Sequence, residues 1–356
     1  MGELLLALPP AGGCARAESE EASNPKNTTT KAERAVTIDP PHGETTAQIV
    51  EYKGTELSAS RPSCGVRVAD TASWIGGCSV QALNATASVT GDVNYIGEMS
   101  GRPRFYANDH SRDVLNLDPR TIQIENVRRP GNTPSLDKEG FTLVQHRSAV
   151  TDFRDQQEIV RAHYPEIERL LLELSGADRV VVTAPGVLRF SEASPDSGRF
   201  NNSRPARFIH IDVSDATAEV FSERSRPTDS ERRVRRTVHF NVWRVLSPPP
   251  QDVPLAVCDA RSLSSGDLVP ADAVFDVTDR PEWSFEGLLV RYNPAHRWCY
   301  FPNMTRDEAL VFKTNDSASG EPHHVPHTAF NDPTCPPGVA PRASIEMRAI
   351  AYWFGP

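Results

Sequence analysis

The sequence lacks several features that would place it in common classes. No run of eighteen apolar residues occurs in its 356 positions, which argues against a membrane-spanning helix. Glycine is outnumbered by proline, 21 against 30. Because proline cannot sit in a helix interior, this excess argues against an all-α fold. A net charge of −9 gives no electrostatic support to nucleic-acid binding. Only 38% of the residues are hydrophobic, which predicts that part of the chain is unpacked.

Cysteine pairs of the CxxC type are also missing. None of the six cysteines forms one, which excludes the familiar zinc ribbons and fingers. A disulfide between Cys64 and Cys78 is one alternative, and reduced thiols in the cytosol are the favoured one. The short leucine run near the N-terminus follows Glu3 and has no Lys or Arg before it, which argues against a signal peptide. We therefore expect a cytoplasmic protein.

The composition changes along the chain and suggests three parts. Residues 10–45 hold almost no large apolar side chain, so burial cannot offset the entropy lost on ordering them. We predict a disordered or weakly ordered tail over residues 1–57. A variable arm is expected over residues 58–90, with Trp74 and Ile75 as anchors. The main domain is expected over residues 91–356.

The main domain is predicted to be mainly β with flanking helices (α+β). A helical pattern over residues 159–174 is interrupted at Pro165, which can begin a second helix, and Gly176 ends it. Strands are predicted at residues 179–183, 208–213, 237–245, 255–259, 288–292, 299–302, 309–312 and 344–354. Because these strands do not alternate regularly with helices, an antiparallel jelly roll is favoured over a doubly wound parallel sheet.

The segment His210-Ile211-Asp212 carries the sharpest chemical signal. Residues i and i+2 of a strand point to the same face, so an imidazole and a carboxylate converge there and could hold one metal ion. The simpler alternative is a hydrogen-bonded His/Asp pair at a strand end. Two histidines and one carboxylate on one face of a ferrous ion leave open positions for a co-substrate and oxygen.

A third ligand must then come from another strand, far downstream. His323, His324 and His327 are the candidates. His323 and His327 have the spacing of a helical zinc site, but Pro322 and Pro326 argue against a helix. We predict His327 as the third ligand.

An arginine and a serine, two positions apart, stand at the start of the last predicted strand. Arg342 and Ser344 share one face of it and could bind a small carboxylate through a bidentate pair and one hydrogen bond. Arg348 lies further along that face. A surface salt bridge with Glu346 is the alternative for these arginines.

Taken in order, these motifs resemble the iron(II)/2-oxoglutarate-dependent oxygenase superfamily, with its double-stranded β-helix (cupin-like) core. They are most similar to its fungal CmcJ-like group, which includes AsaB-type and gibberellin-desaturase-like proteins. The resemblance spans roughly residues 90–356. Besides the motifs above, the matching stretches are residues 140–143, 152–153, 164–167, 241–244, 254–259, 297–304, 308–313, 316–317, 327–330 and 342–348.

The resemblance implies Fe(II) as cofactor, 2-oxoglutarate and O2 as co-substrates, and oxygenase activity. His210, Asp212 and His327 would be the iron ligands, which are the catalytic residues, and Arg342 with Ser344 would bind 2-oxoglutarate. A proline-rich stretch over residues 333–341 resembles an inserted loop, so Arg348 stays an alternative anchor. The group tailors small molecules of fungal secondary metabolism by hydroxylation, desaturation or oxidative cyclisation such as aziridine or endoperoxide formation.

The substrate and several alternatives stay open at this stage. An amino acid, terpenoid, polyketide or alkaloid would fit the group, and Arg244, Arg297 and Arg348 are candidate contacts for a substrate carboxylate. A homodimer is considered, with neither a nucleic-acid nor a membrane partner. The alternatives are an iron oxidase that does not use 2-oxoglutarate, a non-catalytic jelly-roll subunit, and a hydrolytic zinc site.

Overall fold

The computed structural model describes residues 87–355, except residues 130, 132, 229–230 and 278–279. The predicted tail over residues 1–57 lies outside the described residues, and so does nearly all of the predicted arm over residues 58–90. The first strand begins at Ser88, at the end of that arm. Among the described residues, no helix is long and apolar enough to cross a membrane.

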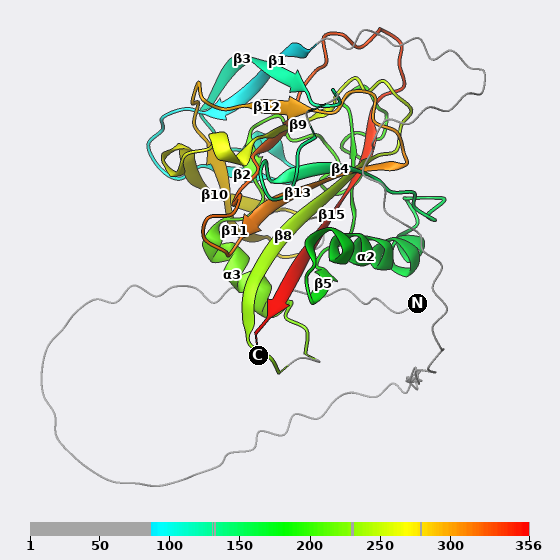
Figure 1. Cartoon of the computed structure of the whole chain (residues 1–356). Coiled ribbons are helices and arrows are strands. Elements are labelled where there is room, and N and C mark those ends of the chain that lie inside the picture. The colour runs from blue at the N-terminus through cyan, green and yellow to red at the C-terminus, as the bar shows by residue number, and fades with distance from the viewer. Residues whose placement is uncertain (1–86, 130, 132, 229–230, 278–279, 356) are drawn as a thin grey trace, which may run out of the picture. The chain divides into compact units, whose positions relative to one another are not determined.

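In the described part of the chain, nine strands form the larger of two sheets; Figure 1 labels most of them. Two of its pairings, β3 with β12 and β10 with β2, are parallel, and the others are antiparallel. The spatial order is β1 (Ser88–Ile96), β3 (Leu117–Asn126), β12 (Trp298–Tyr300), β9 (Leu255–Cys258), β14 (His327–Ala329), β7 (His210–Ile211), β11 (Trp283–Val290), β10 (Leu268–Phe275) and β2 (Arg104–Tyr106).

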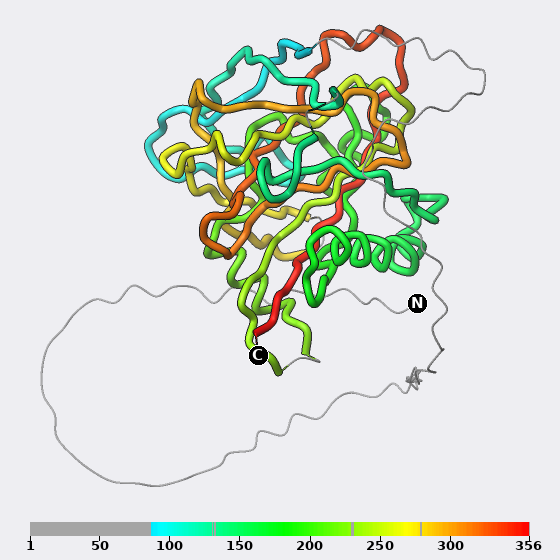
Figure 2. The backbone as a smooth tube through the Cα atoms, in the orientation of Figure 1, coloured from blue at the N-terminus to red at the C-terminus, as the bar shows by residue number. Residues whose placement is uncertain are grey.

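The second sheet is antiparallel throughout. Its path runs β4 (Phe141–Gln145), β13 (Glu308–Asp316), β8 (Val234–Val245), β15 (Ala343–Phe354) and β5 (Arg179–Val182), and β6 (Val187–Phe190) also pairs with β15. The long strands β8 and β15 run side by side through its centre, as the tube in Figure 2 makes plain. This confirms the predicted mainly β, jelly-roll class.

Side chains along β15 alternate between two faces of the smaller sheet. Successive strand residues point to opposite faces. Ile345, Met347 and Ala349 pack into the hydrophobic core that also contains Ile167 and Leu171 of the neighbouring helix. The residues between them, Ser344, Glu346 and Arg348, therefore face the other way, which is the side where the polar contacts described below are made.

The predicted helix is confirmed with a longer start. It consists of α1 (Gln156–Glu158), the π-helical turn η2 (Ile159–His163) and α2 (Tyr164–Ser175). Pro165 lies in the first turn of α2, where its missing N–H costs no hydrogen bond. Gly176 ends α2 in the left-handed conformation at φ 66°, which a residue without Cβ adopts at no steric cost.

Some elements differ from the sequence-based expectation. Helix α3 (Asp215–Arg224) was not predicted, because its buried side chains include Thr217, Ala218 and Ser222 and give no apolar period. Strand β10 was not predicted, since Pro270 and Asp272 interrupt its apolar run. Its partner β11 begins at Trp283, five positions before the predicted strand. Short 3-10 turns complete the described part: η1 (His110–Arg112), η3 (Ala260–Ser262) and η4 (Ser265–Asp267).

Candidate metal centre

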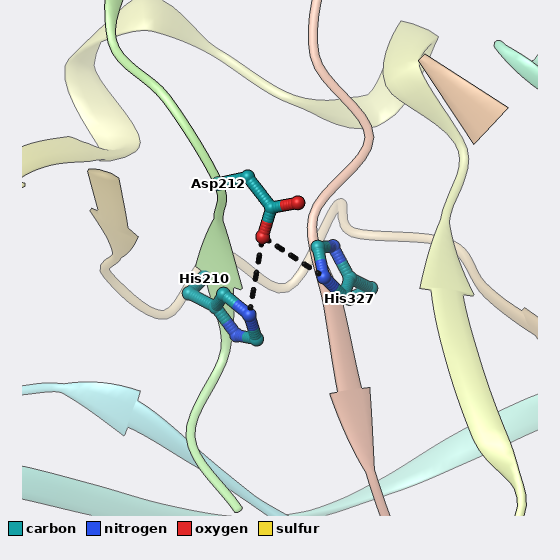
Figure 3. Close-up of side chains that lie close together, drawn as sticks. All are labelled: His210, Asp212 and His327. Atoms are coloured by element: carbon teal, nitrogen blue, oxygen red, sulfur yellow. Dashed lines mark ion pairs between the residues drawn. The ribbon is translucent and has the colours of Figure 1, made fainter. Parts of the chain in front are cut away.

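Two adjacent strands of the larger sheet bring two histidines together. His210 on β7 and His327 on β14 are directly opposite in the antiparallel register. Their ring centroids lie 4.2 Å apart. Asp212 follows directly after β7, and its carboxylate turns toward both rings, as Figure 3 shows. The three residues predicted from motif spacing therefore form one cluster of ligand atoms.

Backbone carbonyls orient both imidazoles. His210 Nδ1 donates to the carbonyl of Phe208 at 3.1 Å, and His327 Nδ1 donates to the carbonyl of Val325 at 3.3 Å. This arrangement leaves each Nε2 lone pair free. Each Nε2 lies 3.7 Å from Asp212 Oδ1, marked by the dashed lines in Figure 3. That distance is too long for a hydrogen bond.

The separations suit a metal ion. Two atoms bound to one first-row metal at about 2.1 Å lie about 3.0 to 3.4 Å apart. The 3.7 Å separations around Asp212 Oδ1 therefore leave space for an ion that would draw the three groups slightly together. Two neutral imidazoles and one carboxylate are a donor set for a divalent first-row transition metal, so the residues present fit such an ion.

The second oxygen of Asp212 is held from the opposite sheet. Asn241 Nδ2 on β8 donates to Asp212 Oδ2 at 3.0 Å, and Arg348 Nε on β15 donates to the same oxygen at 2.9 Å. Asn241 and Arg348 are cross-strand partners, so the register of β8 and β15 sets both donors at once. Oδ1 is thereby left to face the histidines.

Protonation states match those of metal ligands. Burial lowers the pKa of His210 to about 3, with the neighbouring His327 adding to the effect, and burial also lowers the pKa of His327. Burial by itself raises the pKa of Asp212, but the Arg348 guanidinium and the two imidazoles outweigh it and hold that pKa well below its usual range. At pH 7 the imidazoles are neutral and the carboxylate is ionised, as metal binding requires.

Arg348 forms ion pairs with two carboxylates. Besides Asp212 it contacts Glu346 Oε1, and Glu346 also pairs with Arg189 Nε at 3.1 Å. Burial raises the pKa of Glu346, but the two arginines lower it to about 2. The local sequence indicated only the pairing of Arg348 with Glu346, because Arg189 and Asp212 both lie far upstream of these two residues.

Arg342 is buried, and none of the acids within residues 87–355, as far as the structure describes them, forms an ion pair with its side chain. Its Nη1 donates to Ser344 Oγ at 2.6 Å, which confirms that the two residues share a face. Nε and Nη2 find no hydrogen-bond partner within the described part of the chain, although the residue is only 2% exposed. Burial lowers the pKa of Arg342 to about 10, and the guanidinium stays charged at pH 7. A buried cation with two unsatisfied donors calls for an anionic acceptor.

Two pockets meet at the histidine cluster. The smaller has about 300 Å³ of open space and is lined by His210, His327, Arg342, Glu346 and Trp243, among others. The larger has about 560 Å³ of space, part of which is open to solvent. Its lining includes His210, Asp212, Arg348 and four phenylalanines: Phe105, Phe208, Phe275 and Phe285. His210 thus lines both pockets, whereas Asp212 lines the larger one and His327 the smaller one.

Other predicted candidates lie elsewhere. Arg244 bonds to the carbonyls of His146 and Arg306, each at 2.6 Å. Arg297 pairs with Glu125 and Asp259. Neither lines the two pockets.

His239 and the two histidines near β14 also take other roles. His239 bonds to Ser222 and to the Ala218 carbonyl of α3. His323 and His324 face Asp215 instead of the three-residue cluster.

Comparison with known proteins places the chain in a family. Residues 93–352 match the family model described as an oxidoreductase/YMDC permease-like domain. The chain is 31% identical over 251 residues to a hydroxylase/desaturase, CTB9, of Cercospora beticola, covering 66% of this chain and 76% of that protein. It is 26% identical over 244 residues to the Fe(II)/2-oxoglutarate-dependent dioxygenase nvfI of Aspergillus novofumigatus, covering 67% and 85%.

A solved structure shares the fold. The iron and alpha-ketoglutarate-dependent endoperoxidase NvfI superposes with a TM-score of 0.64 at 21% identity, covering 76% of this chain and 100% of that chain. This supports the double-stranded β-helix core. With the family match, the sequence relatives and the shared fold, the chain belongs to the fungal Fe(II)/2-oxoglutarate-dependent oxygenases and is an oxidoreductase.

Proposed function

We propose that His210, Asp212 and His327 bind Fe(II) and that Arg342 with Ser344 binds the distal carboxylate of 2-oxoglutarate. The observation that carries this proposal is the buried Arg342 guanidinium, whose Nε and Nη2 are unpartnered and which lines the same pocket as His210 and His327. A dicarboxylic acid could satisfy both ends of this pocket, one at the metal and the other at Arg342.

Arg342 is a better anchor than Arg348. Arg348 Nε is bound to Asp212 and its Nη2 to Glu346, and these ion pairs raise its pKa although burial opposes them. Arg342 forms no ion pair within the described residues and has free donors. Arg348 therefore acts as a positioning residue for Asp212. The same free donors disfavour an oxidase that works without 2-oxoglutarate.

The chain's own residues would divide the work of an oxygenase. Bound Fe(II), 2-oxoglutarate and O2 supply an oxidant that can remove a hydrogen atom from a C–H bond. Arg342, whose Nη1 is held by Ser344 Oγ, would orient the co-substrate along the smaller pocket. Asn241 and Arg348 keep Asp212 Oδ1 directed at the metal position. The substrate is then presented from the larger pocket, where His210 and Asp212 form part of the wall.

The larger pocket favours an apolar, ring-containing substrate. Four half-buried phenylalanines line it, and the rings of Phe105 and Phe208 are 4.9 Å apart. Arg204, also in the lining, adds positive charge that suits a carbonyl, hydroxyl or carboxylate oxygen. We therefore infer a terpenoid or polyketide carrying oxygen groups in preference to a free amino acid, which is too small and polar for a wall of four phenylalanines.

Three broader expectations accompany the proposal. The oxygenase domain is proposed to cover residues 91–356, which the family match over residues 93–352 supports. The tail over residues 1–57 and the arm over residues 58–90 are proposed to lie outside it. Action in the cytoplasm and assembly as a homodimer remain proposals, testable by fractionation and by light scattering.

An anaerobic titration tests the proposed site. Metal-free protein is given Fe(II) and then 2-oxoglutarate, and the visible charge-transfer absorption of a chelated iron and keto-acid complex is followed. We expect one equivalent of each. A shift of this absorption by terpenoids or polyketides, and none by free amino acids, would support the substrate class.

Each failure of the titration has a separate meaning. Stoichiometric iron without the absorption band would overturn the role of 2-oxoglutarate, and absence of iron binding would overturn the assigned ligands. A shift by free amino acids alone would overturn the substrate class.

A further inference from the structure

A second group of two histidines and one aspartate lies outside the proposed iron site. The ligand atoms of Asp215, His323 and His324 all lie within 4.8 Å of one another. We propose that these three residues form a second metal site, open to solvent, which takes a divalent transition-metal ion such as Zn2+. The proposal does not depend on which molecule the oxygenase oxidises.

The fold brings the three residues together from two segments. Asp215 is the first residue of α3, directly after Ser214, whose side chain accepts from the Thr217 backbone N–H. His323 and His324 lie between β13 and β14, in a segment without regular structure. In a strand, two consecutive side chains would point to opposite faces. The irregular backbone here lets both rings face Asp215.

The orientation of His324 is fixed for metal binding. Its Nδ1 donates to the carbonyl of Thr314 at 2.8 Å, which leaves the Nε2 lone pair free. That Nε2 lies 3.4 Å from Asp215 Oδ1. Ligand atoms at about 2.1 Å from a tetrahedral zinc ion are separated by about 3.4 Å, so this pair already has the spacing of a zinc site.

His323 needs one small movement. Its Nε2 contacts Asp215 Oδ1 at 2.7 Å, a hydrogen bond that must open by about 0.7 Å to reach the tetrahedral spacing of about 3.4 Å. The side chains of His323 and Asp215 are 39% and 73% exposed, so neither is locked by packing. The same exposure leaves the fourth tetrahedral position open to water.

The charges at the site favour a cation of intermediate softness. Burial lowers the pKa of His324 to about 4, so its imidazole is neutral at pH 7. Burial raises the pKa of Asp215, but the hydrogen bond from His323 outweighs it and lowers that pKa, so the carboxylate is ionised. Two imidazoles and one carboxylate suit zinc, copper or nickel better than magnesium or calcium. The positive end of α3 opposes a cation, so we expect weaker binding than at the deep site.

Occupancy would connect the two segments that carry the proposed iron ligands. Asp215 follows Asp212 after two residues, and His324 precedes His327 by the same interval. An ion bound between Asp215 and His324 would therefore join the end of the β7 segment to the start of β14. The site is a candidate clamp for the ligand-bearing strands.

Metal stoichiometry of the full chain tests the proposal. Metal-free protein is titrated with Zn2+ by calorimetry, and with Co2+ while visible absorption reports tetrahedral binding. We expect two equivalents for the wild type, one for His323→Ala and for Asp215→Asn, and one for His327→Ala. His110→Ala is the matched control, because His110 is a similarly exposed histidine paired with a single aspartate, Asp113.

Each outcome is decisive. Two equivalents that fall to one in His323→Ala, with the control unchanged, support the second site. One equivalent in the wild type that only His327→Ala removes would overturn it and leave the proposed iron site intact. Retention of both equivalents in folded His323→Ala and Asp215→Asn proteins would overturn it as well, with circular dichroism reporting the fold.

Discussion

The deep cluster of His210, Asp212 and His327 and the shallow cluster of Asp215, His323 and His324 contain the same donor types but are held differently. In the deep cluster both histidine nitrogens stay 3.7 Å from the carboxylate oxygen. In the shallow cluster one histidine has closed to 2.7 Å. The first arrangement is open for an ion, whereas the second has collapsed into a hydrogen bond.

The cause of this difference lies behind each aspartate. Asp212 is held by Asn241 and Arg348 through the oxygen that faces away from the histidines. Asp215 receives Asn315 Nδ2 at 2.8 Å on the same oxygen that faces its histidines. Donor identity alone therefore does not distinguish a preorganised centre from one that must rearrange to bind an ion. The two are distinguished by hydrogen bonds to the carboxylate oxygen that faces away from the histidines, because such bonds fix the carboxylate and leave its other oxygen free for the metal.

The largest expected effect comes from removing the deep carboxylate. Asp212→Ala should lower turnover by about 10³-fold or more, because two imidazoles alone hold iron poorly and Arg348 loses its partner. Turnover and bound iron are measured together, with Asp267→Asn as a control aspartate that also pairs with one histidine, His296. If Asp212→Ala kept its iron and its turnover, the deep cluster would lose its assigned role.

The second effect concerns a feature that only the deep cluster has nearby, the unpartnered guanidinium of Arg342. Arg342→Gln should raise the KM for 2-oxoglutarate about 100-fold, because a charge-assisted bidentate pair is replaced by a single neutral hydrogen bond. Fe(II) affinity measured without co-substrate should stay the same. A larger change in Fe(II) affinity than in KM would argue that Arg342 supports the metal instead.

Two asparagines provide the sharpest matched pair. Asn241→Leu removes the donor from the far oxygen of Asp212 and should weaken Fe(II) binding about 10-fold to 100-fold. Asn315→Leu frees the metal-facing oxygen of Asp215 and should leave Zn2+ affinity at the shallow cluster equal or slightly higher. Calorimetry on both variants measures the two constants. Equal losses of metal affinity at both clusters would show that it does not matter which carboxylate oxygen the asparagine binds.

Sequence reasoning found the deep cluster because its signals are local. The spacing of His210 and Asp212, and of Arg342 and Ser344, follows from strand alternation. His327 was predicted as the third ligand from among three downstream histidines, after Pro322 and Pro326 had argued against a helical zinc site. The supporting contacts could not be found in this way. Whether Asn241 meets Arg348 and Asp212 depends on the register of β8 against β15 and on how the two sheets approach each other.

The shallow cluster shows the same limit in another form. His323 and His324 were visible only as competitors of His327, because their partner Asp215 begins a helix that the sequence did not reveal. The buried face of α3 uses Thr217, Ala218 and Ser222, which carry no apolar period. Similarly, β10 was missed because Pro270 and Asp272 lie within it, although its pairing with β11 tolerates both.

The smallest expected effect concerns His239, which belongs to neither cluster. It distinguishes loss of bound metal at low pH from unfolding of the protein at low pH. Burial lowers the pKa of His239 to about 4, so the folded chain holds it neutral while the unfolded chain binds a proton near pH 6.5. The contribution of His239 to the free energy of unfolding is therefore fully present above pH 6.5 and is lost as the pH drops toward 4. Between pH 6.5 and 5, the free energy of unfolding of His239→Gln should therefore fall by about 2 kcal/mol less than that of the wild type. Denaturant unfolding of the metal-free protein measures both values. If the free energy of unfolding changed with pH equally in both proteins, the acid sensitivity would belong to other buried groups. As a control, the metal affinities of both clusters at pH 7 should be the same in His239→Gln and in the wild type.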